Sequence, residues 1–456
     1  MDRHLFLHRR VHRAMHPTSV MALGFLIIIL TGAALLSLPF AAQNGEPTGF
    51  LTALFTATSA TCVTGLVTVG TATHWSNFGQ AVLLLLIQIG GLGFMTLASV
   101  ASFLMRRTIT LRERMVMSAG LNLTDNAGIV RLTRRVLFGT FTFEGLGAIL
   151  LACRFVPRFG FLRGVKMGVF HSVSAFCNAG FDLLGTPEQP FSSLTGYTGD
   201  PVVNLTVMAL IVLGGLGFFV WGDIWDKRRF RHFRLHTKLV LVTTGLLLAL
   251  GFVTTMLFEW NNPETLGLLP PGEKVLAAAF QSVTLRTAGF NTVDQAALTG
   301  PSQAVACLLM LIGGSPGSTA GGIKTVTAAV LLLSTLSALR GRTTATAFGR
   351  TIVPRGVMNA VTMMIVGVVV SLTGACTISY LEAVPFHKCL FEAVSAFATV
   401  GLSMGLTPVL GPVSHFILIV LMYLGRVGVL TLGVSVLMRH REPPKMRYPD
   451  AQVMVG

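Results

Sequence analysis

Eight long apolar stretches recur along the chain, and a shorter, less hydrophobic stretch lies between the two members of each consecutive pair. About 20 predominantly apolar residues are needed to cross a bilayer as an α-helix. Each long stretch therefore predicts a transmembrane helix. The predicted spans are residues 18–40, 78–105, 136–155, 201–225, 237–258, 304–339, 356–381 and 413–438.

The stretch inside each pair has about a dozen residues, too few to cross a bilayer, which indicates a re-entrant half-helix. The sequence thus predicts an all-α integral membrane protein of four fused helix–pore loop–helix repeats. Eight transmembrane helices and four re-entrant pore helices would surround one central pore with fourfold pseudosymmetry. The expected divisions are a tail at 1–17, repeat 1 at 18–105, a loop at 106–135, repeat 2 at 136–226, repeat 3 with a broken second helix at 227–339, repeat 4 at 340–438 and a tail at 439–456.

Composition agrees with a bilayer as the solvent, because 52% of the 456 residues are hydrophobic, 11% are charged and the mean hydropathy is +0.72. The net charge of +16 does not indicate nucleic acid here, because most Lys and Arg residues lie in the tails and in loops 106–135, 227–238 and 340–355. This distribution predicts a cell-membrane protein with both termini cytoplasmic. The first apolar stretch is long enough to remain as a helix, so no cleaved signal peptide is expected.

The opposite side is predicted to be net acidic, which attracts cations. Its acidic residues are Glu46, Asp182, Glu188, Asp200, Glu259, Glu264, Glu273, Asp294, Glu382 and Glu392. The loop with Arg154, Arg158 and Arg163 is an exception, because it is basic although it is placed on this side. The six cysteines form no C-x-x-C pair and the histidines lack ligand spacing, so neither disulfides nor a protein-ligated metal site is predicted.

The four re-entrant segments align with one another, and each has a hydroxyl residue followed by a glycine and a large apolar residue. They read TATSATCVTGL, HSVSAFCNAGF, QSVTLRTAGF and EAVSAFATVGL, and the third is one residue shorter between hydroxyl and glycine. One such glycine alone would indicate close helix packing, but four aligned glycines favour a shared function. The predicted filter residues are Cys62, Val63, Thr64 and Gly65; Cys177, Asn178, Ala179 and Gly180; Thr287, Ala288 and Gly289; and Ala398, Thr399, Val400 and Gly401.

A conduction site for a bare alkali cation needs carbonyl oxygens that replace the ion's hydration shell. Glycine allows the required backbone dihedrals and keeps the pore free of side chains. Each half-helix would end at the filter, where its C-terminal partial charge of about half an elementary charge favours a cation. The pattern therefore predicts an alkali cation at the filter as the transported ion, with no cofactor and no catalytic residue in this chain.

These segments, together with GGSPGSTAGGIKT and YLGRVGVLTL, resemble the Ktr, Trk and HKT superfamily of potassium transporters over nearly the whole chain. Eight spans make the chain most similar to the Ktr-type membrane subunit. The resemblance implies one pore per chain, a homodimer and a cytoplasmic nucleotide-binding regulatory ring of the RCK type. In plant relatives a serine at the first filter glycine goes with sodium transport, so Gly65 favours potassium. Whether Na⁺ is a coupling ion stays open.

Residues 304–339 are too long for one span, and their middle is rich in glycine, which breaks a helix. The segment consists of Gly313, Gly314, Ser315, Pro316, Gly317, Ser318, Thr319, Ala320, Gly321 and Gly322. Broken backbone at membrane depth must be buried in protein or line a water-filled cavity. The resemblance implies an intramembrane gate just below the filter, and we name residues 313–322 the gate loop. The alternative is a flexible linker.

Four charged residues are predicted inside the membrane, where an uncompensated charge is costly. Arg426 either slows ions below the filter or hydrogen-bonds carbonyls freed by the broken helix, and the two roles are compatible. Lys324 lies where the broken helix restarts and is expected to face the cytoplasmic vestibule. Arg286 is expected to brace the third filter segment. Glu144 is either a structural hydrogen-bond partner or a site that couples sodium or proton movement.

Two other classes of protein remain as alternatives. A secondary transporter of an organic solute or another cation also uses broken helices, although it usually shows two halves rather than four short repeats. A membrane-embedded enzyme would need paired acid and base residues within its spans, which Glu144 alone does not supply. The chain has no Gly-rich phosphate loop, so nucleotide sensing would belong to a partner. The basic loops 106–135 and 227–238 and the tail 439–447 would dock that partner or contact anionic lipid.

Overall fold

The computed structural model describes residues 17–93 and 129–428. Within these two ranges the chain is helical apart from loops and one two-residue hairpin. Most of the predicted N-terminal tail, residues 106–128 of loop 106–135, the end of the 413–438 span and the whole C-terminal tail lie outside the described residues, and residues 129–135 form the start of a helix. The end of the 78–105 span lies outside them as well.

The described elements repeat one order, in which a long helix is followed by two helices of 12–16 residues; the first of these two is called the short helix and the second the medium helix of its repeat. In repeats 1 and 2 they are α1 (Pro17–Leu36), α2 (Phe50–Thr61), α3 (Thr71–His74), α4 (Asn77–Leu92), α7 (Ile129–Phe159), α8 (Phe161–Phe176), α9 (Pro201–Leu216) and α10 (Phe218–Lys227). In repeats 3 and 4 they are α11 (Leu235–Glu259), α12 (Pro271–Thr284), α13 (Gly300–Leu311), α14 (Thr325–Leu339), β1 (Thr346–Ala347), β2 (Arg350–Thr351), α15 (Pro354–Glu382), α16 (Phe386–Ala398) and α17 (Pro412–Val427).

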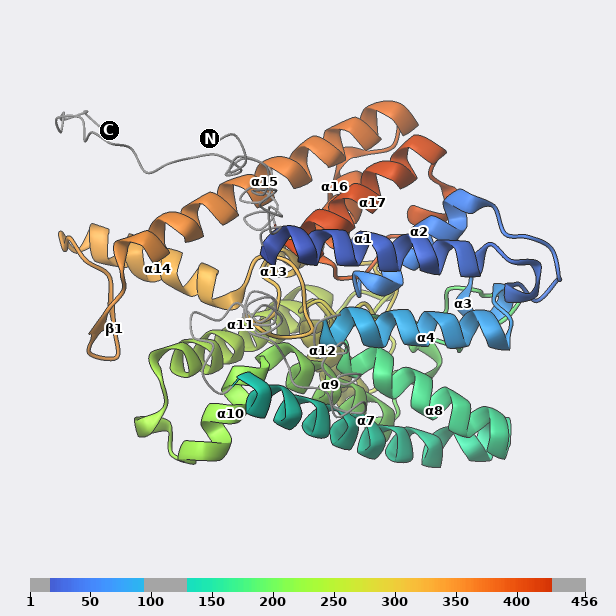
Figure 1. The fold of residues 1–456 in the computed structure, drawn as a ribbon, viewed down its shortest axis with the longest axis horizontal. Helices are drawn as coiled ribbons and strands as arrows, with labels where there is room; N and C mark the ends of the chain where they lie inside the picture. Colours follow the sequence, from blue (N-terminus) through green and yellow to red (C-terminus); the bar gives the residue numbers. More distant parts are fainter. Residues whose placement is uncertain (1–16, 94–128, 429–456) are drawn as a thin grey trace, which may run out of the picture.

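Each long helix packs against the short helix that follows it, as α1 does on α2 and α15 on α16. Neighbouring repeats meet in a closed order. Contacts join α4 to α8, α9 to α12, α13 to α16 and α17 to α2, so the fourth repeat lies beside the first (Figure 1). This circular order brings the ends of α2, α8, α12 and α16 toward one centre.

Among the described helices, α1, α7, α11 and α15 are each long and apolar enough to cross a membrane, and α9 with α10 qualifies as a bent pair. The apolar helices α4, α13, α14 and α17 are shorter. Helices α4 and α17 end at Leu92 and Val427, one residue before the described ranges end at Gly93 and Gly428. The predicted total of eight spans therefore stays a prediction.

The prediction of one continuous span at 201–225 is wrong in its geometry. Helices α9 and α10 meet at an angle of 91°. The junction residue Gly217 has φ +92°, and the N–H of Phe218 donates to the Gly317 carbonyl at 2.9 Å instead of continuing the helix. An ordinary residue disfavours this dihedral, so the glycine permits the bend and the contact with the gate loop fixes it.

Large apolar side chains are exposed on the outer helices, as expected for a surface that faces lipid rather than water. Phe138 and Ile149 on α7 are 77% and 63% exposed, and Leu257 on α11 is 71% exposed. The interior instead buries aromatic side chains such as Phe176 and Phe290 beside the filter segments. The apolar pattern therefore positions the short helices inside a ring of longer ones.

Candidate functional site

The four short helices end in the same local conformation. One to three residues after each helix ends, one residue adopts a left-handed φ, and two residues later a glycine adopts a positive φ. The first residues are Val63 (+56°), Asn178 (+59°), Thr287 (+64°) and Thr399 (+52°), and the glycines are Gly65 (+98°), Gly180 (+69°), Gly289 (+80°) and Gly401 (+90°). Only glycine adopts such angles at little cost, so the backbone conformation explains why glycine occurs at all four positions.

The aligned hydroxyl residues hold the segments by hydrogen bonds, a role that the sequence alone did not reveal. Ser59 and Ser395 accept the N–H groups of Gly65 and Gly401 at 3.0 and 3.1 Å. In the second segment, the Ser174 hydroxyl instead donates to the Phe181 carbonyl at 2.7 Å. In the shorter third segment, Thr284 donates in the same way to the carbonyl of Phe290.

The four glycines form a ring in which each lies against the carbonyl before the next glycine. A Cβ atom added to Gly65 would lie 2.5 Å from the Ala179 carbonyl oxygen, and one added to Gly180 would lie 2.8 Å from that of Ala288. Continuing round the ring, a Cβ at Gly289 would lie 2.7 Å from the Val400 oxygen and one at Gly401 2.0 Å from the Thr64 oxygen. The structure thus brings all four predicted filter segments together, and no side chain fits at any of the four glycines.

The gate loop is folded against these segments from one side. Its Thr319 hydroxyl donates to the Phe176 carbonyl at 3.2 Å, at the end of α8. A Cβ added to Gly321 would lie 2.1 Å from the Thr399 hydroxyl oxygen, at the end of α16. The N–H of Ser315 donates to the Gly215 carbonyl of α9 at 3.0 Å. The loop is therefore fixed between repeats 2 and 4.

Arg426 joins three parts of the site. Its guanidinium donates to the carbonyls of Thr319 in the gate loop and of Gly90 in α4, and to that of Gly91 at 3.3 Å. Lys324 donates to the Ala320 carbonyl at 2.7 Å, so it caps the end of the loop. These carbonyls are the hydrogen-bond acceptors for Arg426, in line with the hydrogen-bonding role that the sequence predicts for it.

Arg286 is 7% exposed, and its Nη2 donates to the Gly313 carbonyl at 2.7 Å. It therefore links the third filter segment, where it lies, to the beginning of the gate loop. Glu144 is 6% exposed on α7 and accepts two bonds from the Gln88 amide, at 3.1 and 3.2 Å. The Cys177 thiol lies 3.8 Å from the same carboxylate. Glu144 on α7 therefore contacts the second filter segment through Cys177.

Two residues predicted on the acidic surface, Glu259 and Glu392, are instead buried and have no exposed area. Glu392 accepts bonds from the Ser403 and Thr407 hydroxyls at 2.5 and 2.7 Å. Glu259 is held by the Thr265 hydroxyl at 2.7 Å and by other polar groups of its loop. Glu392 thus secures the segment that follows α16, and Glu259 secures the loop that precedes α12, since a buried carboxylate must be hydrogen-bonded.

Sequence reasoning missed a set of glycines on the medium helices. A Cβ atom on Gly90, Gly214 or Gly425 would lie 2.0, 1.9 and 1.7 Å from the carbonyl oxygens of Thr61, Phe176 and Phe397, respectively. These glycines let the medium helices of repeats 1, 2 and 4 touch the end of a short helix. A sequence signal was present, because G-G-L-G-F occurs at both 90–94 and 214–218.

Within residues 17–93 and 129–428, no cluster of three or more His, Cys, Asp or Glu side chains is arranged to hold a metal ion. The oxygen atoms gathered at the glycine ring belong to the backbone. Such carbonyls suit a weakly held, exchanging alkali cation better than a resident metal.

Comparisons with known proteins agree with this geometry. The family model described as "Cation transport protein" (TrkH) matches residues 4–446. The chain is 40% identical to the potassium/sodium uptake protein NtpJ of Enterococcus hirae, over 98% of this chain and 99% of that protein. It is 41% identical to the Ktr system potassium uptake protein B of Bacillus subtilis, over 96% and 97%.

The fold is similar to the crystal structure of the potassium transporter TrkH from Vibrio parahaemolyticus, with a TM-score of 0.71 and 18% identity, covering 94% of this chain and 86% of that one. The apolar helices, the glycine ring and the family match show a multi-pass membrane protein that is a transporter and not an enzyme. The chain therefore belongs to the TrkH/Ktr family of cation transport proteins.

Proposed function

We propose that this chain is the ion-translocating subunit of a potassium uptake system and that the glycine ring is its selectivity filter. The ring itself carries the proposal, because Gly65, Gly180, Gly289 and Gly401 each lie against a carbonyl of the next segment. Backbone carbonyls in a ring can replace the hydration shell of an alkali cation. Relatives with about 40% identity are named as potassium uptake proteins, which supports K⁺ as the ion.

In this proposal α2, α8, α12 and α16 are pore helices whose C-terminal ends favour a cation at the centre of the membrane. Four pore loops and eight spans surround one pathway with fourfold pseudosymmetry, and both termini are cytoplasmic in the cell membrane. The matching conformations at the ends of the four short helices support the pseudosymmetry. The basic loop 227–238 supports the orientation.

The gate loop lies below the filter and closes the pathway at rest. Its support is its position between the ends of α8 and α16 and its bond to Arg426. Arg426 also places a positive charge near the pathway, which slows cations. Opening then requires the loop to leave its hydrogen-bond partners.

A regulatory partner is proposed to move the loop. The relatives are named as parts of a "Ktr system", and a system has further components. We assign to this chain a homodimeric state and a cytoplasmic RCK-type nucleotide-binding ring. Coupling to Na⁺ is left for experiment, since one relative's name includes sodium.

Uptake of ⁸⁶Rb⁺, K⁺, Na⁺ and Li⁺ into proteoliposomes tests this function, with protein-free liposomes as the control and a regulatory ring added in a parallel sample. Selective K⁺ and Rb⁺ uptake is expected. If no alkali cation moves in either sample, the filter assignment fails, and labelled organic solutes become the next substrates to test. Na⁺ uptake that accompanies K⁺ uptake and depends on it would establish coupling.

A further inference from the structure

The turn between α7 and α8 is basic, whereas the other loops predicted on the same side of the membrane are mostly acidic. Arg154 and Arg158 lie on the last turns of α7, and Arg163 lies near the start of α8. Aligning the V-S-A-F of α8 with that of α16 places Ser379 and Val384 at the positions of Arg158 and Arg163 in repeat 4. The repeat therefore does not need arginine here in order to fold.

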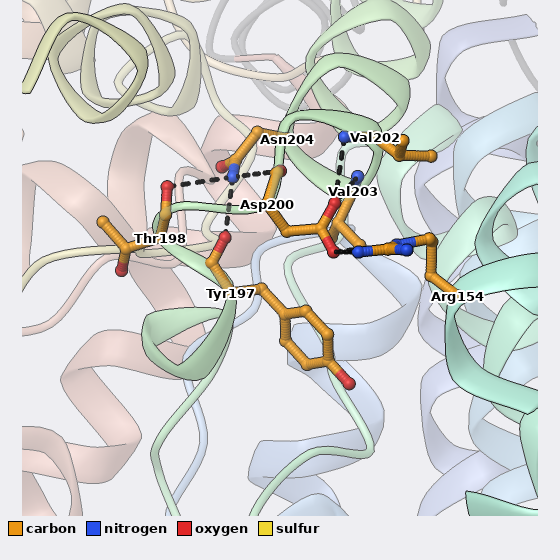
Figure 2. A network of polar contacts seen from close by, with 7 residues as sticks. All are labelled: Arg154, Tyr197, Thr198, Asp200, Val202, Val203 and Asn204. Carbon is orange, nitrogen blue, oxygen red and sulfur yellow. Dashed lines mark hydrogen bonds and ion pairs between the residues drawn. The ribbon is translucent and has the colours of Figure 1, made fainter. Parts of the chain in front are cut away.

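Arg154 has a structural role. Its Nε and Nη2 donate to the Asp200 carboxylate at 2.9 and 2.6 Å, and the other oxygen of that carboxylate accepts the N–H groups of Val202 and Val203 at the start of α9 (Figure 2). The Asn204 amide ties the preceding loop by donating to three carbonyls (Figure 2). The charge of Arg154 is thus offset within the fold.

Arg158 and Arg163 are held in a different way. Their guanidinium carbons lie 5.7 and 5.4 Å from the centroid of the same ring, Phe159, and Arg158 also lies 5.0 Å from the Tyr197 ring. Neither has a carboxylate partner in the described part of the chain. The aromatic contacts hold both guanidiniums without a carboxylate, so their N–H groups are available to a phosphate, which arginine binds well.

An open cavity of about 530 Å³ adjoins Arg158 and is lined by Arg154, Arg158, Tyr197, Asp200 and Glu273 among others, whereas Arg163 lies outside its lining. Glu273 also lines the cavity, beside Gly199, and Asp200 is neutralised by Arg154. The charges here without an ion-pair partner among the described residues are therefore two guanidiniums on the α7–α8 turn, of which only Arg158 lines the cavity, and the Glu273 carboxylate on α12, with a combined net charge of +1. A phosphodiester with a hydroxylated headgroup would satisfy both sides.

Two exposed apolar residues next to the arginines favour a phospholipid over free phosphate as the ligand. Phe161 and Leu162, between the two arginines in sequence, are 77% and 84% exposed. Free phosphate would cover the guanidiniums but would leave these side chains in water. A phospholipid covers both, because its phosphate meets the arginines and its acyl chains meet the apolar residues.

We infer that the α7–α8 turn is a binding site for an anionic glycerophospholipid, whose phosphate lies between Arg158 and Arg163. In the proposed orientation this lipid belongs to the outer leaflet, and only this choice of leaflet rests on the proposed function. The lipid would cover the outer end of α7, the helix that supports the second filter segment through Glu144.

Native mass spectrometry of the full-length chain in detergent tests this inference by counting bound phosphatidylglycerol and phosphatidylcholine. Arg158→Gln and Arg163→Gln are each expected to weaken phosphatidylglycerol retention about tenfold, which corresponds to about 1.4 kcal/mol. Lys388→Gln is the matched control, because it removes a positive charge near the start of another short helix, α16, and should change retention little. Thermal unfolding of each variant verifies folding, and ⁸⁶Rb⁺ uptake is measured separately.

Equal retention of phosphatidylglycerol by the wild type and both arginine variants would overturn the site. Equal retention of the two lipids by the wild type would overturn the preference for an anionic headgroup. Displacement of the lipid by inorganic phosphate alone would show a free-phosphate site instead, and a changed monomer–dimer ratio with unchanged lipid would show a contact between copies. None of these outcomes depends on ion transport, so failure here and failure of the proposed function are distinguishable.

Discussion

Gly401→Ala places a methyl group at the centre of the glycine ring. The Cβ atom would lie 2.0 Å from the Thr64 carbonyl oxygen and 2.9 Å from the Gly65 Cα. These atoms belong to the backbone of the first filter segment and cannot move away as a flexible side chain would. The carbonyl of Thr64 or the whole fourth segment must therefore shift.

Two costs follow from this geometry. The φ of +90° at Gly401 is strained for alanine, which costs about 1–2 kcal/mol. The steric overlap adds about 1–3 kcal/mol, the usual range for overpacking a tight interior. A displaced carbonyl also weakens K⁺ coordination, and a change of about 1.4 kcal/mol at the barrier alters the rate about tenfold.

Gly405→Ala separates these two costs. Gly405 has φ +78°, close to that of Gly401, but no atom lies within 4 Å of the added Cβ. Both variants should lower the unfolding temperature, because both carry the dihedral strain. Only Gly401→Ala should reduce ⁸⁶Rb⁺ uptake by about tenfold or more and reduce the preference for K⁺ over Na⁺ in a competition assay.

Normal uptake and selectivity in a folded Gly401→Ala protein would refute the assignment of the ring as the filter. Equal losses in the two variants would show that backbone strain, rather than the position in the ring, causes the defect. Gly401→Ser adds a hydroxyl to the same methyl position and should fail in the same way as alanine.

Three further predictions concern groups around the filter. Burial raises the pKa of Asp182, just after the second filter segment, to about 6. The negative charge of Asp182 is lost as the pH falls through that value, so K⁺ uptake at low K⁺ concentration should fall in this pH range. An Asp182→Asn variant whose uptake keeps the same pH dependence would contradict this prediction. Glu144→Ala leaves the Gln88 amide without its acceptor, which costs about 1–3 kcal/mol, and Glu144→Gln should recover unfolding temperature and uptake; low uptake in a stable Gln variant would favour ion coupling instead. Arg426→Gln removes bonds to the gate loop and should raise ⁸⁶Rb⁺ flux without a regulatory partner, whereas unchanged flux would count against a gating role.

The filter segments were predictable because four short sequences could be compared with one another. Alignment of Gly65 with its counterparts identified residues that the structure places in one ring, which hydropathy alone would not have done. The shorter third segment still reaches the same dihedrals. Its helix, α12, ends at the hydroxyl residue Thr284 itself, whereas α2 continues two residues beyond Ser59. The missing residue is thus taken from the helix end.

Features that depend on distant partners were not predictable. The apolar run 201–225 gives no sign of the bend at Gly217, because a glycine in a helix costs only about 1 kcal/mol and is common in membrane helices. The bend follows from a bond to Gly317, a hundred residues along the chain. Likewise, Glu144 could not be assigned a partner, since Gln88 lies 56 residues away in another repeat.

The gate loop is tied to every repeat, which sets the energy that a regulator must supply. Arg426 connects its Thr319 to Gly90 in repeat 1, Ser315 bonds to Gly215 in repeat 2, and Arg286 reaches Gly313 within repeat 3. Each such bond is worth about 0.5–1.5 kcal/mol net, and more when the donor is charged. Shifting a loop from 1% to 99% open requires about 5.5 kcal/mol of differential binding. A partner that binds both states equally would open nothing, so the regulator must contact surfaces that change when the loop moves. Helix α10 is one such surface, because the bond from Phe218 to Gly317 couples its position directly to the gate loop.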